Sequence, residues 1–275
     1  MVDFLGKSEY TVYDLKKLIE ILRSPNGCPW DREQTHESIS RNLLEEAYEA
    51  AEAINTRNTE ALREELGDVL MQVVFHSDIE EKLGNFSLDD VAHAACEKLI
   101  SRHPHVFGGK TAATGAEVLA NWEVLKSKEK KHKTISDEMN AVAESLPALW
   151  RAEKVQQKAA KVGFDWPDCS GAIEALVSEL RELSEAVQNN GDVSSELGDL
   201  IFSAVNLARF FKIDPEKSLT DSTDKFILRF REMEKLVASA NLRLEDMSLE
   251  EMDKFYDDAK LILHERIRGG NIVLL

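Results

Sequence analysis

Cysteine is scarce in this chain of 275 residues. The three cysteines, Cys28, Cys96 and Cys169, are odd in number and lie far apart. This spacing excludes a disulfide framework and a zinc motif built from paired cysteines. Such a chain suits a reducing compartment, so we expect a cytoplasmic protein.

Long apolar runs and an excess of positive charge are also missing. No apolar segment approaches the roughly 20 residues of a membrane helix, and the first residues show no signal-like apolar region. Lys and Arg number 34 against 51 Asp and Glu, giving a formal charge of -17. This charge repels phosphate polymers and anionic lipids, so we expect neither a nucleic-acid polymer nor a membrane as partner. A small phosphate ligand held through a metal remains compatible with it.

Alternating apolar and polar residues, the mark of strands, form no convincing run. Aromatic residues make up 7%, and the six prolines fall at the expected ends of helices. Hydrophobic residues make up 43%, which is enough to build a core. The sequence therefore predicts an all-α protein, with helices over about residues 12–23, 35–55, 59–83, 87–103, 172–190, 193–212 and 214–240, a helix starting near 116, and a last one after Ser248.

An acidic signature occurs twice in the chain. In each copy a Glu-x-x-Glu pair is followed by a Glu-Leu-Gly-Asp sequence on the next predicted helix. Because residues three apart share one face of a helix, the two acids of each pair lie on the same face. A Lys/Arg pair with i,i+4 spacing follows each copy. A duplicated helical module is the economical explanation. The carboxylates are Glu46, Glu49, Glu65 and Asp68 in the first copy and Glu179, Glu182, Glu196 and Asp199 in the second; the basic pairs are Lys98 with Arg102 and Lys225 with Arg229.

The repeat also predicts the domain organisation. We expect an N-terminal module over residues 10–133, a linker over 134–146, a C-terminal module over 147–265 and a tail over 266–275.

Four carboxylates on neighbouring antiparallel helices repel one another. Each like-charge helical pair costs on the order of 0.2–0.5 kcal/mol, and a bound divalent cation reverses that cost. Mg²⁺ prefers oxygen ligands and keeps substrate phosphates in its shell. The pattern therefore predicts a metal–nucleotide site. Gly67 and Gly198 lie inside the helical pattern, where glycine is unfavourable, so we expect another helix or a ligand to approach closely there.

Other residues are candidates for substrate contacts. Lys225 and Arg229 would neutralise phosphates, with Arg able to bind bidentately; the alternative is that they pair with nearby acids. Asn206 lies two turns after Asp199 on the same face and could contact the ligand or metal-bound water. Tyr256 could contact the substrate or anchor the core.

Eight short motifs together resemble the MazG family of nucleoside triphosphate pyrophosphohydrolases, in its full-length form with two modules. The resemblance covers about residues 10 to 262. The motifs are Asn26-Gly-Cys-Pro-Trp-Asp31, Leu44-Glu-Glu-Ala-Tyr-Glu49, Glu65-Leu-Gly-Asp68, Arg102-His-Pro-His-Val-Phe107, Ser145-Leu-Pro-Ala-Leu149, Val162-Gly-Phe-Asp-Trp166, Glu196-Leu-Gly-Asp199 and Val205-Asn-Leu-Ala-Arg209.

The resemblance implies an all-α fold whose duplicated modules pair into four-helix bundle cores, and a homodimer. It implies that NTPs or dNTPs are cleaved by water to NMP and diphosphate with Mg²⁺, for which Mn²⁺ could substitute, and it suggests the removal of unwanted nucleotides. It places metal on the eight carboxylates and the triphosphate on the two Lys/Arg pairs. From the chemistry of metal-assisted hydrolysis, Glu179 or Glu182 is our candidate for orienting or deprotonating water.

The chain departs from relatives at several positions. Ala175 and Asp192 stand where relatives can carry basic residues, and Phe255-Tyr256 stands where some have Trp.

Two alternatives remain open on the sequence. A di-iron carboxylate bundle uses Glu-x-x-His pairs, and the chain contains Glu33/His36 and Glu129/His132. A non-catalytic helical scaffold that binds a partner would show no turnover.

Overall fold

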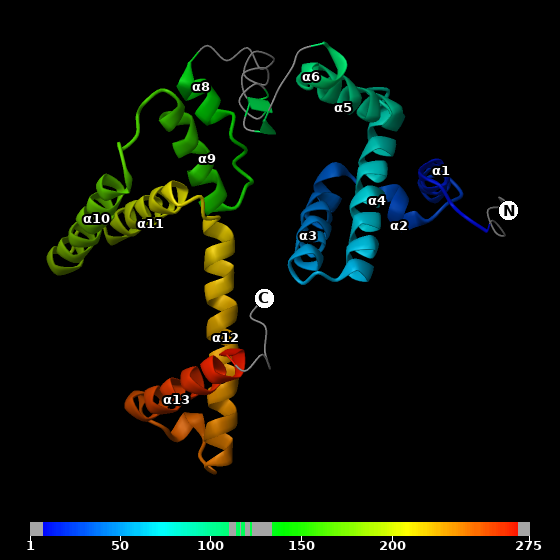
Figure 1. Cartoon of the computed structure of the whole chain (residues 1–275). Coiled ribbons are helices and arrows are strands. Elements are labelled where there is room, and N and C mark those ends of the chain that lie inside the picture. Colours follow the sequence, from blue (N-terminus) through cyan, green and yellow to red (C-terminus); the bar gives the residue numbers. More distant parts are fainter. Residues whose placement is uncertain (1–7, 110–113, 116, 119–121, 123–133, 269–275) are drawn as a thin grey trace. The chain divides into compact units, whose positions relative to one another are not determined.

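A computed structural model describes residues 8–109, 114, 115, 117, 118, 122 and 134–268. Every regular element in these ranges is a helix, so the predicted all-α class is confirmed (Figure 1). Within these ranges no helix is both long and apolar enough to cross a bilayer. The chain divides into two compact units, Met1–Glu129 and Lys130–Leu275, while the finer module boundaries expected above stay predictions.

The N-terminal unit is built around the hairpin of α3 and α4. Helices α1 and α5 both pack against α4, and α1 does so along the C-terminal half of α4, where Lys16 pairs with Glu81 and Arg23 with Asp78. Ile39 of α3 and Val74, Phe75 and Ile79 of α4 form the core with Ile19 of α1. The helices are α1 (Val12–Leu22), α2 (Pro29–Glu33), α3 (His36–Asn55), α4 (Thr59–Leu83), α5 (Leu88–Arg102) and α6 (Pro104–Phe107).

The C-terminal unit contains a second hairpin, formed by α10 and α11. Helix α9 contacts α8, α11 and α12, and α12 packs along α13. Met233 and Val237 of α12 and Ala259 of α13 form a small buried cluster. The elements are α8 (Ile135–Asn140), α9 (Ala148–Lys161), α10 (Cys169–Asn189), α11 (Val193–Phe210), α12 (Pro215–Ser239), the 3₁₀ turn η1 (Leu244–Asp246) and α13 (Leu249–Arg268).

Side-chain caps fix where the predicted helices begin. Thr11, Thr35 and Ser87 each accept a hydrogen bond from the backbone N–H three residues on, and the side chain of that residue bonds back to the cap. Such boxes satisfy N–H groups that the helix leaves unpaired. Gly84 ends α4 with φ of 78°, a conformation that favours glycine. These signals explain why the predicted and observed ends agree closely.

The segment over 134–146, predicted as a linker, contains α8, and Lys158 of α9 forms an ion pair with Glu138 of α8 at 3.1 Å. Helix α9 follows Pro147, which gives it no side-chain cap. Its start therefore carries no Ser, Thr, Asn or Asp signal.

Candidate active site

The α10–α11 hairpin gathers the acids of the second signature. Carboxylate oxygens of Glu179, Glu196 and Asp199 lie within 4.8 Å of one another. Partial burial, followed by repulsion from Glu182, Asp199 and Glu196, raises the pKa of Glu179. Glu182 is exposed and accepts a hydrogen bond from the Ser178 hydroxyl at 3.0 Å. Three of the four predicted ligands therefore form one group, and the fourth acts on it electrostatically.

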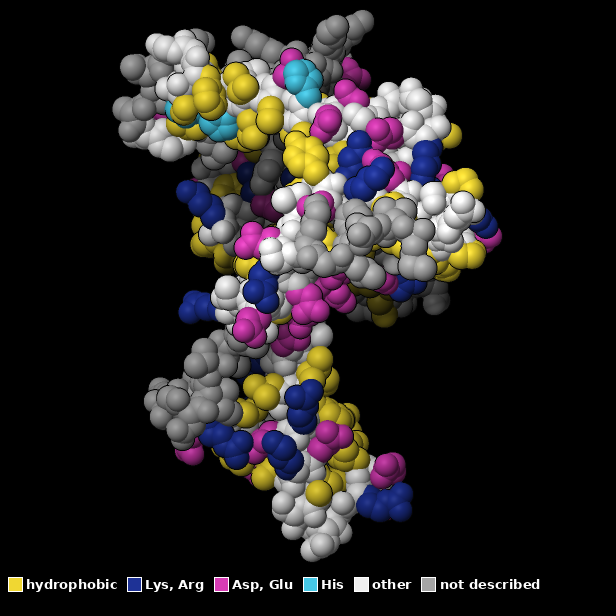
Figure 2. Space-filling model, turned by 90° about the vertical axis from the view of Figure 1, so that its right-hand side faces the viewer, with side chains coloured by type: hydrophobic (Ala, Val, Ile, Leu, Met, Phe, Trp, Pro, Cys, Tyr) yellow, Lys and Arg dark blue, Asp and Glu magenta, His cyan; other side chains and the backbone are white. Residues whose placement is uncertain are grey.

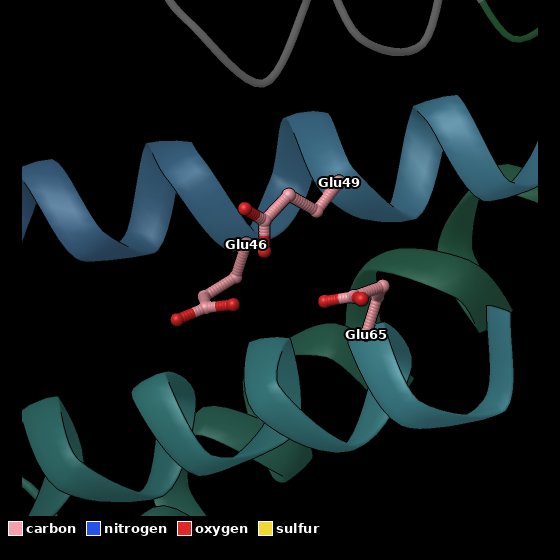
Figure 3. Close-up of side chains that lie close together, drawn as sticks. All are labelled: Glu46, Glu49 and Glu65. Carbon is pink, nitrogen blue, oxygen red and sulfur yellow. The ribbon is translucent and has the colours of Figure 1, made fainter. Parts of the chain in front are cut away.

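The α3–α4 hairpin repeats this arrangement. Glu46 and Glu49 project from α3 and Glu65 from α4, and their carboxylates gather between the two helices (Figure 3). Oxygens of these three residues also lie within 4.8 Å of one another. Partial burial, then repulsion from Asp68 and Glu49, raises the pKa of Glu46. Burial and the Glu49 charge likewise raise the pKa of Glu65.

A raised carboxyl pKa in both hairpins has a chemical meaning. The negative charges are crowded by the fold, so a proton or a cation at this point relieves the repulsion. Three oxygen donors on a partly exposed face fit a hard divalent cation that keeps open positions for water and phosphate. Among the described residues, the clusters able to hold a metal are these two, and neither contains histidine.

The two helix-interior glycines do not meet the expectation of a neighbouring helix. A Cβ added at Gly67 or at Gly198 would find no atom within 4 Å outside its own helix. The expected close approach of another helix is therefore wrong for the described single chain. The open space beside each signature leaves room for a ligand.

The predicted phosphate-binding cations lie on other helices. Lys98 and Arg102 are on α5, where the Arg102 guanidinium lies 5.8 Å from the centre of the Trp122 ring. Lys225 and Arg229 are on α12, which contacts α11. Within the described ranges, neither Lys225 nor Arg229 forms an ion pair with a carboxylate. The structure thus brings the acids together and leaves these two cations unengaged by them.

The two remaining candidates occupy different surroundings. Asn206 lines a cavity beside α9, and its Oδ1 accepts hydrogen bonds from Arg209 Nε at 3.2 Å and Nη2 at 2.8 Å. Tyr256 packs against the cluster of Met233, Val237 and Ala259. Its ring centre lies 5.9 Å from that of Phe226, so it joins α13 to α12.

Sequence reasoning missed several polar contacts. His36 pairs with His76 and Glu80 at 2.7 and 2.6 Å, instead of acting with Glu33. Glu129 and His132 of the other iron-type motif lie outside the described residues. Arg209 also donates a hydrogen bond to Asp165, which joins the motif over residues 205–209 to the motif over 162–166. The two residues are 44 positions apart in the sequence, so no helical spacing predicts their contact.

Comparison with known proteins agrees with the geometry. The family model described as the MazG nucleotide pyrophosphohydrolase domain matches residues 34–107 and 170–233, the segments that carry the two acidic groups. A Thermotoga maritima protein named nucleoside triphosphate pyrophosphohydrolase/pyrophosphatase MazG is 44% identical over 247 residues, covering 90% of this chain and 94% of the relative.

Two further relatives extend the comparison. The nucleoside triphosphate pyrophosphohydrolase of Escherichia coli K12 is 39% identical over 251 residues, covering 90% of this chain and 95% of its own. An uncharacterized Bacillus subtilis protein, YabN, is 46% identical over 249 residues, which are 89% of this chain and 50% of that protein.

Proposed function

Because the chain belongs to the MazG nucleotide pyrophosphohydrolase family, we propose that its carboxylate groups are the metal sites of a nucleoside triphosphate pyrophosphohydrolase. The enzyme uses water to hydrolyse an NTP to NMP and diphosphate. In this reaction the bond between the α and β phosphates breaks, water supplies the new oxygen, and diphosphate leaves.

The observation that carries the proposal is the convergence of Glu179, Glu196 and Asp199 within 4.8 Å. The family implies a divalent metal, and we propose Mg²⁺, with Mn²⁺ as a substitute because it shares the preference for oxygen ligands. Glu182 would complete the ligand set from the same face of α10. When bound, Mg²⁺ supplies Lewis-acid polarisation of the phosphate and a lower pKa for bound water.

The chain's own residues would then position the reactants. Glu179 or Glu182 would accept a hydrogen bond from the attacking water and orient it. Lys225 and Arg229, which have no carboxylate partner among the described residues, would neutralise the triphosphate. Tyr256 would contact the nucleoside end of the substrate from α13.

We propose the same assignment for the first module. Glu46, Glu49, Glu65 and Asp68 would hold metal, and Lys98 and Arg102 would contact phosphate. Both ribose and deoxyribose triphosphates are proposed substrates, in a cytoplasmic role of removing unwanted nucleotides.

We also propose a homodimer, on the evidence of an uncovered apolar face. Apolar side chains lie at the surface between charged ones on the face drawn in Figure 2. Exposed apolar side chains of the α10–α11 hairpin, a surface that this view does not show, form two stripes with helical spacing, on which a second hairpin could complete a four-helix core. The exposed residues are Ile173, Val177, Leu180 and Val187 on α10 and Leu197 and Ile201 on α11.

Product analysis tests the proposal. The full chain is incubated with a panel of NTPs and dNTPs and with Mg²⁺, and the products are separated by ion-exchange chromatography. We expect NMP and diphosphate in equal amounts, and no turnover after chelation of the metal. Release of NDP and orthophosphate would contradict the proposed reaction.

A further inference from the structure

One position beside the acids differs between the two hairpins. The residue just before the first acid of the Glu-x-x-Glu pair is Glu45 on α3 and Ser178 on α10. Glu45 accepts a hydrogen bond from Arg41 Nε, one turn earlier, at 2.8 Å. Ser178 carries a hydroxyl instead, which can donate a proton as well as accept one. The duplicated module therefore offers an internal comparison of a carboxylate and a hydroxyl at the same place.

The Ser178 hydroxyl fixes the side chain of Glu182. Its Oγ donates to Glu182 Oε1 at 3.0 Å, and the spacing of four residues places both side chains on one face of α10. A carboxylate has two oxygens, each able to accept hydrogen bonds. The bond to Ser178 engages Oε1 and restricts the rotation of the side chain, so Oε2 is the oxygen left for another partner.

The two modules place the second acid of the pair differently. Glu49 lies within the first acidic group, whereas its counterpart Glu182 lies outside the second. The residue four positions earlier accounts for this difference. Glu45 is a carboxylate, which repels Glu49 and has no proton to donate to it, whereas Ser178 donates one to Glu182. The hydroxyl thus holds Glu182 at the edge of the acidic group.

A carboxylate at the edge of a metal-binding group is suited to act on water. Oxygens of Glu179, Glu196 and Asp199 lie within 4.8 Å of one another, so these are the ones that a single cation would engage. An acid beside this set keeps lone pairs for hydrogen bonding, as a group that accepts a proton from water must. Glu182 follows Glu179 by three residues on the same face of α10, so it lies next to the metal-binding group.

We propose that Ser178 is a positioning residue for the hydrolysis, which holds Glu182 by Oε1 so that Oε2 orients the attacking water. As the water oxygen bonds to phosphorus, its proton passes to Glu182 and the bond to the departing diphosphate breaks. The inference rests on the proposed function, and it selects Glu182 over Glu179 as the acid that acts on water. Hydrogen bonds that orient the groups of a metal site in this way contribute about 10–100-fold to activity or metal affinity.

Ser178→Ala tests the hydroxyl without weakening the helix, because Ala favours a helix more than Ser does. We expect kcat for NTP hydrolysis at saturating Mg²⁺ to fall about tenfold or more. Ser178→Thr, which keeps a hydroxyl, should stay close to the parent value. Ser184→Ala is the matched control, since Ser184 is an exposed serine of α10 whose hydroxyl accepts a hydrogen bond from Gln188. A parent-like kcat in Ser178→Ala, or an equal loss in Ser184→Ala, would overturn the proposal.

A double-variant cycle shows whether Ser178 acts through Glu182. We expect Ser178→Ala to lower kcat in the parent background and to cause no further loss in the Glu182→Ala background, where the hydroxyl has no carboxylate to hold. The same fractional loss in both backgrounds would reveal a structural role alone and would contradict the proposal. A parent chain that hydrolyses no NTP refutes the proposed function and this inference together, whereas hydrolysis that Ser178→Ala leaves unchanged refutes the role of Ser178 alone.

Discussion

Crowded carboxylates dominate the chemistry of single residues in this protein. Burial, and then mutual repulsion, raises the pKa of Glu46, Glu65 and Glu179 above its ordinary value of 4.5. A carboxyl group of this kind favours the folded state at low pH. That contribution is lost as the pH rises through the raised pKa, because the folded chain must then hold the charges together.

This loss of stability with rising pH leads to a prediction about how Mg²⁺ and pH act together. Mg²⁺ should raise the Tm more at about pH 7.5 than at about pH 5, because protons compete with the metal for the same oxygens. Thermal unfolding at both pH values, with and without the metal, measures the effect. In Glu179→Gln the pH dependence of the Tm increase by Mg²⁺ should weaken. An equal Tm increase at both pH values in the parent chain would contradict the assignment of the carboxylates as metal ligands.

A buried ion pair stabilises the N-terminal unit. Arg23 Nε lies 2.7 Å from Asp78 Oδ2, and the two side chains are 7% and 4% exposed. Lys82 Nζ lies 2.7 Å from the same oxygen. We expect Asp78→Ala to destabilise this unit by about 3–5 kcal/mol, because it leaves the Arg23 charge buried without its partner. Urea unfolding followed by circular dichroism measures the loss.

Glu45→Ala is the matched control for that variant. Glu45 pairs with Arg41 at 2.8 Å, but the two side chains are 52% and 86% exposed. Removing an exposed pair should change the unfolding free energy by less than about 1 kcal/mol. Similar losses in the two variants would show that burial does not govern the Asp78 contact.

At the level of helices, capping residues and hydrophobic period made most of the fold predictable. Thr35 and Asn58 cap α3 and α4 with their side chains, and these ends were predicted within a residue. Short helices such as α6, of four residues, are too brief to show a period. The acidic groups were predictable because residues three apart on a helix share a face. The cavity beside α9 was not, because Gln156 meets Phe202 through a backbone oxygen that no sequence pattern marks.

Two stacked histidines join the start of α3 to α4. The Nδ1 atoms of His36 and His76 lie 2.7 Å apart, which requires one of them to be unprotonated. Burial, and then the charge of His36, lowers the pKa of His76 from its ordinary value of 6.5. Because the unfolded chain then binds protons more readily, the stability from this contact is full above that value and is lost as the pH falls below it.

We therefore expect the N-terminal unit to lose stability on acidification, and His76→Gln to remove part of that dependence. Hydrogen exchange of α3 and α4 amides as a function of pH follows this unit by itself. His93→Gln is the control, since His93 is an exposed residue of α5. A pH dependence that His76→Gln leaves unchanged would contradict this explanation.

For the whole molecule, the exposed apolar stripes of α10 and α11 predict assembly. Leu180 is 56% exposed and Ile201 45% exposed. A Glu at either position would place a charge in the middle of the proposed interface, so Leu180→Glu and Ile201→Glu should dissociate the dimer. Light scattering after size-exclusion chromatography gives the mass. Leu249→Glu, at a 71% exposed position on α13, should leave the dimer intact; a monomeric parent chain would refute the interface.

Steady-state NTP hydrolysis by Glu46→Gln, Glu179→Gln and the double variant tests whether the clustered carboxylates catalyse the reaction. Gln keeps the shape of each side chain and removes one ligand charge, and loss of one preorganised electrostatic contact lowers kcat by about 100-fold or more. We expect such a loss in at least one single variant and in the double variant, with full activity in Glu185→Gln, an acid of α10 outside the cluster. Wild-type turnover in the double variant would contradict the account.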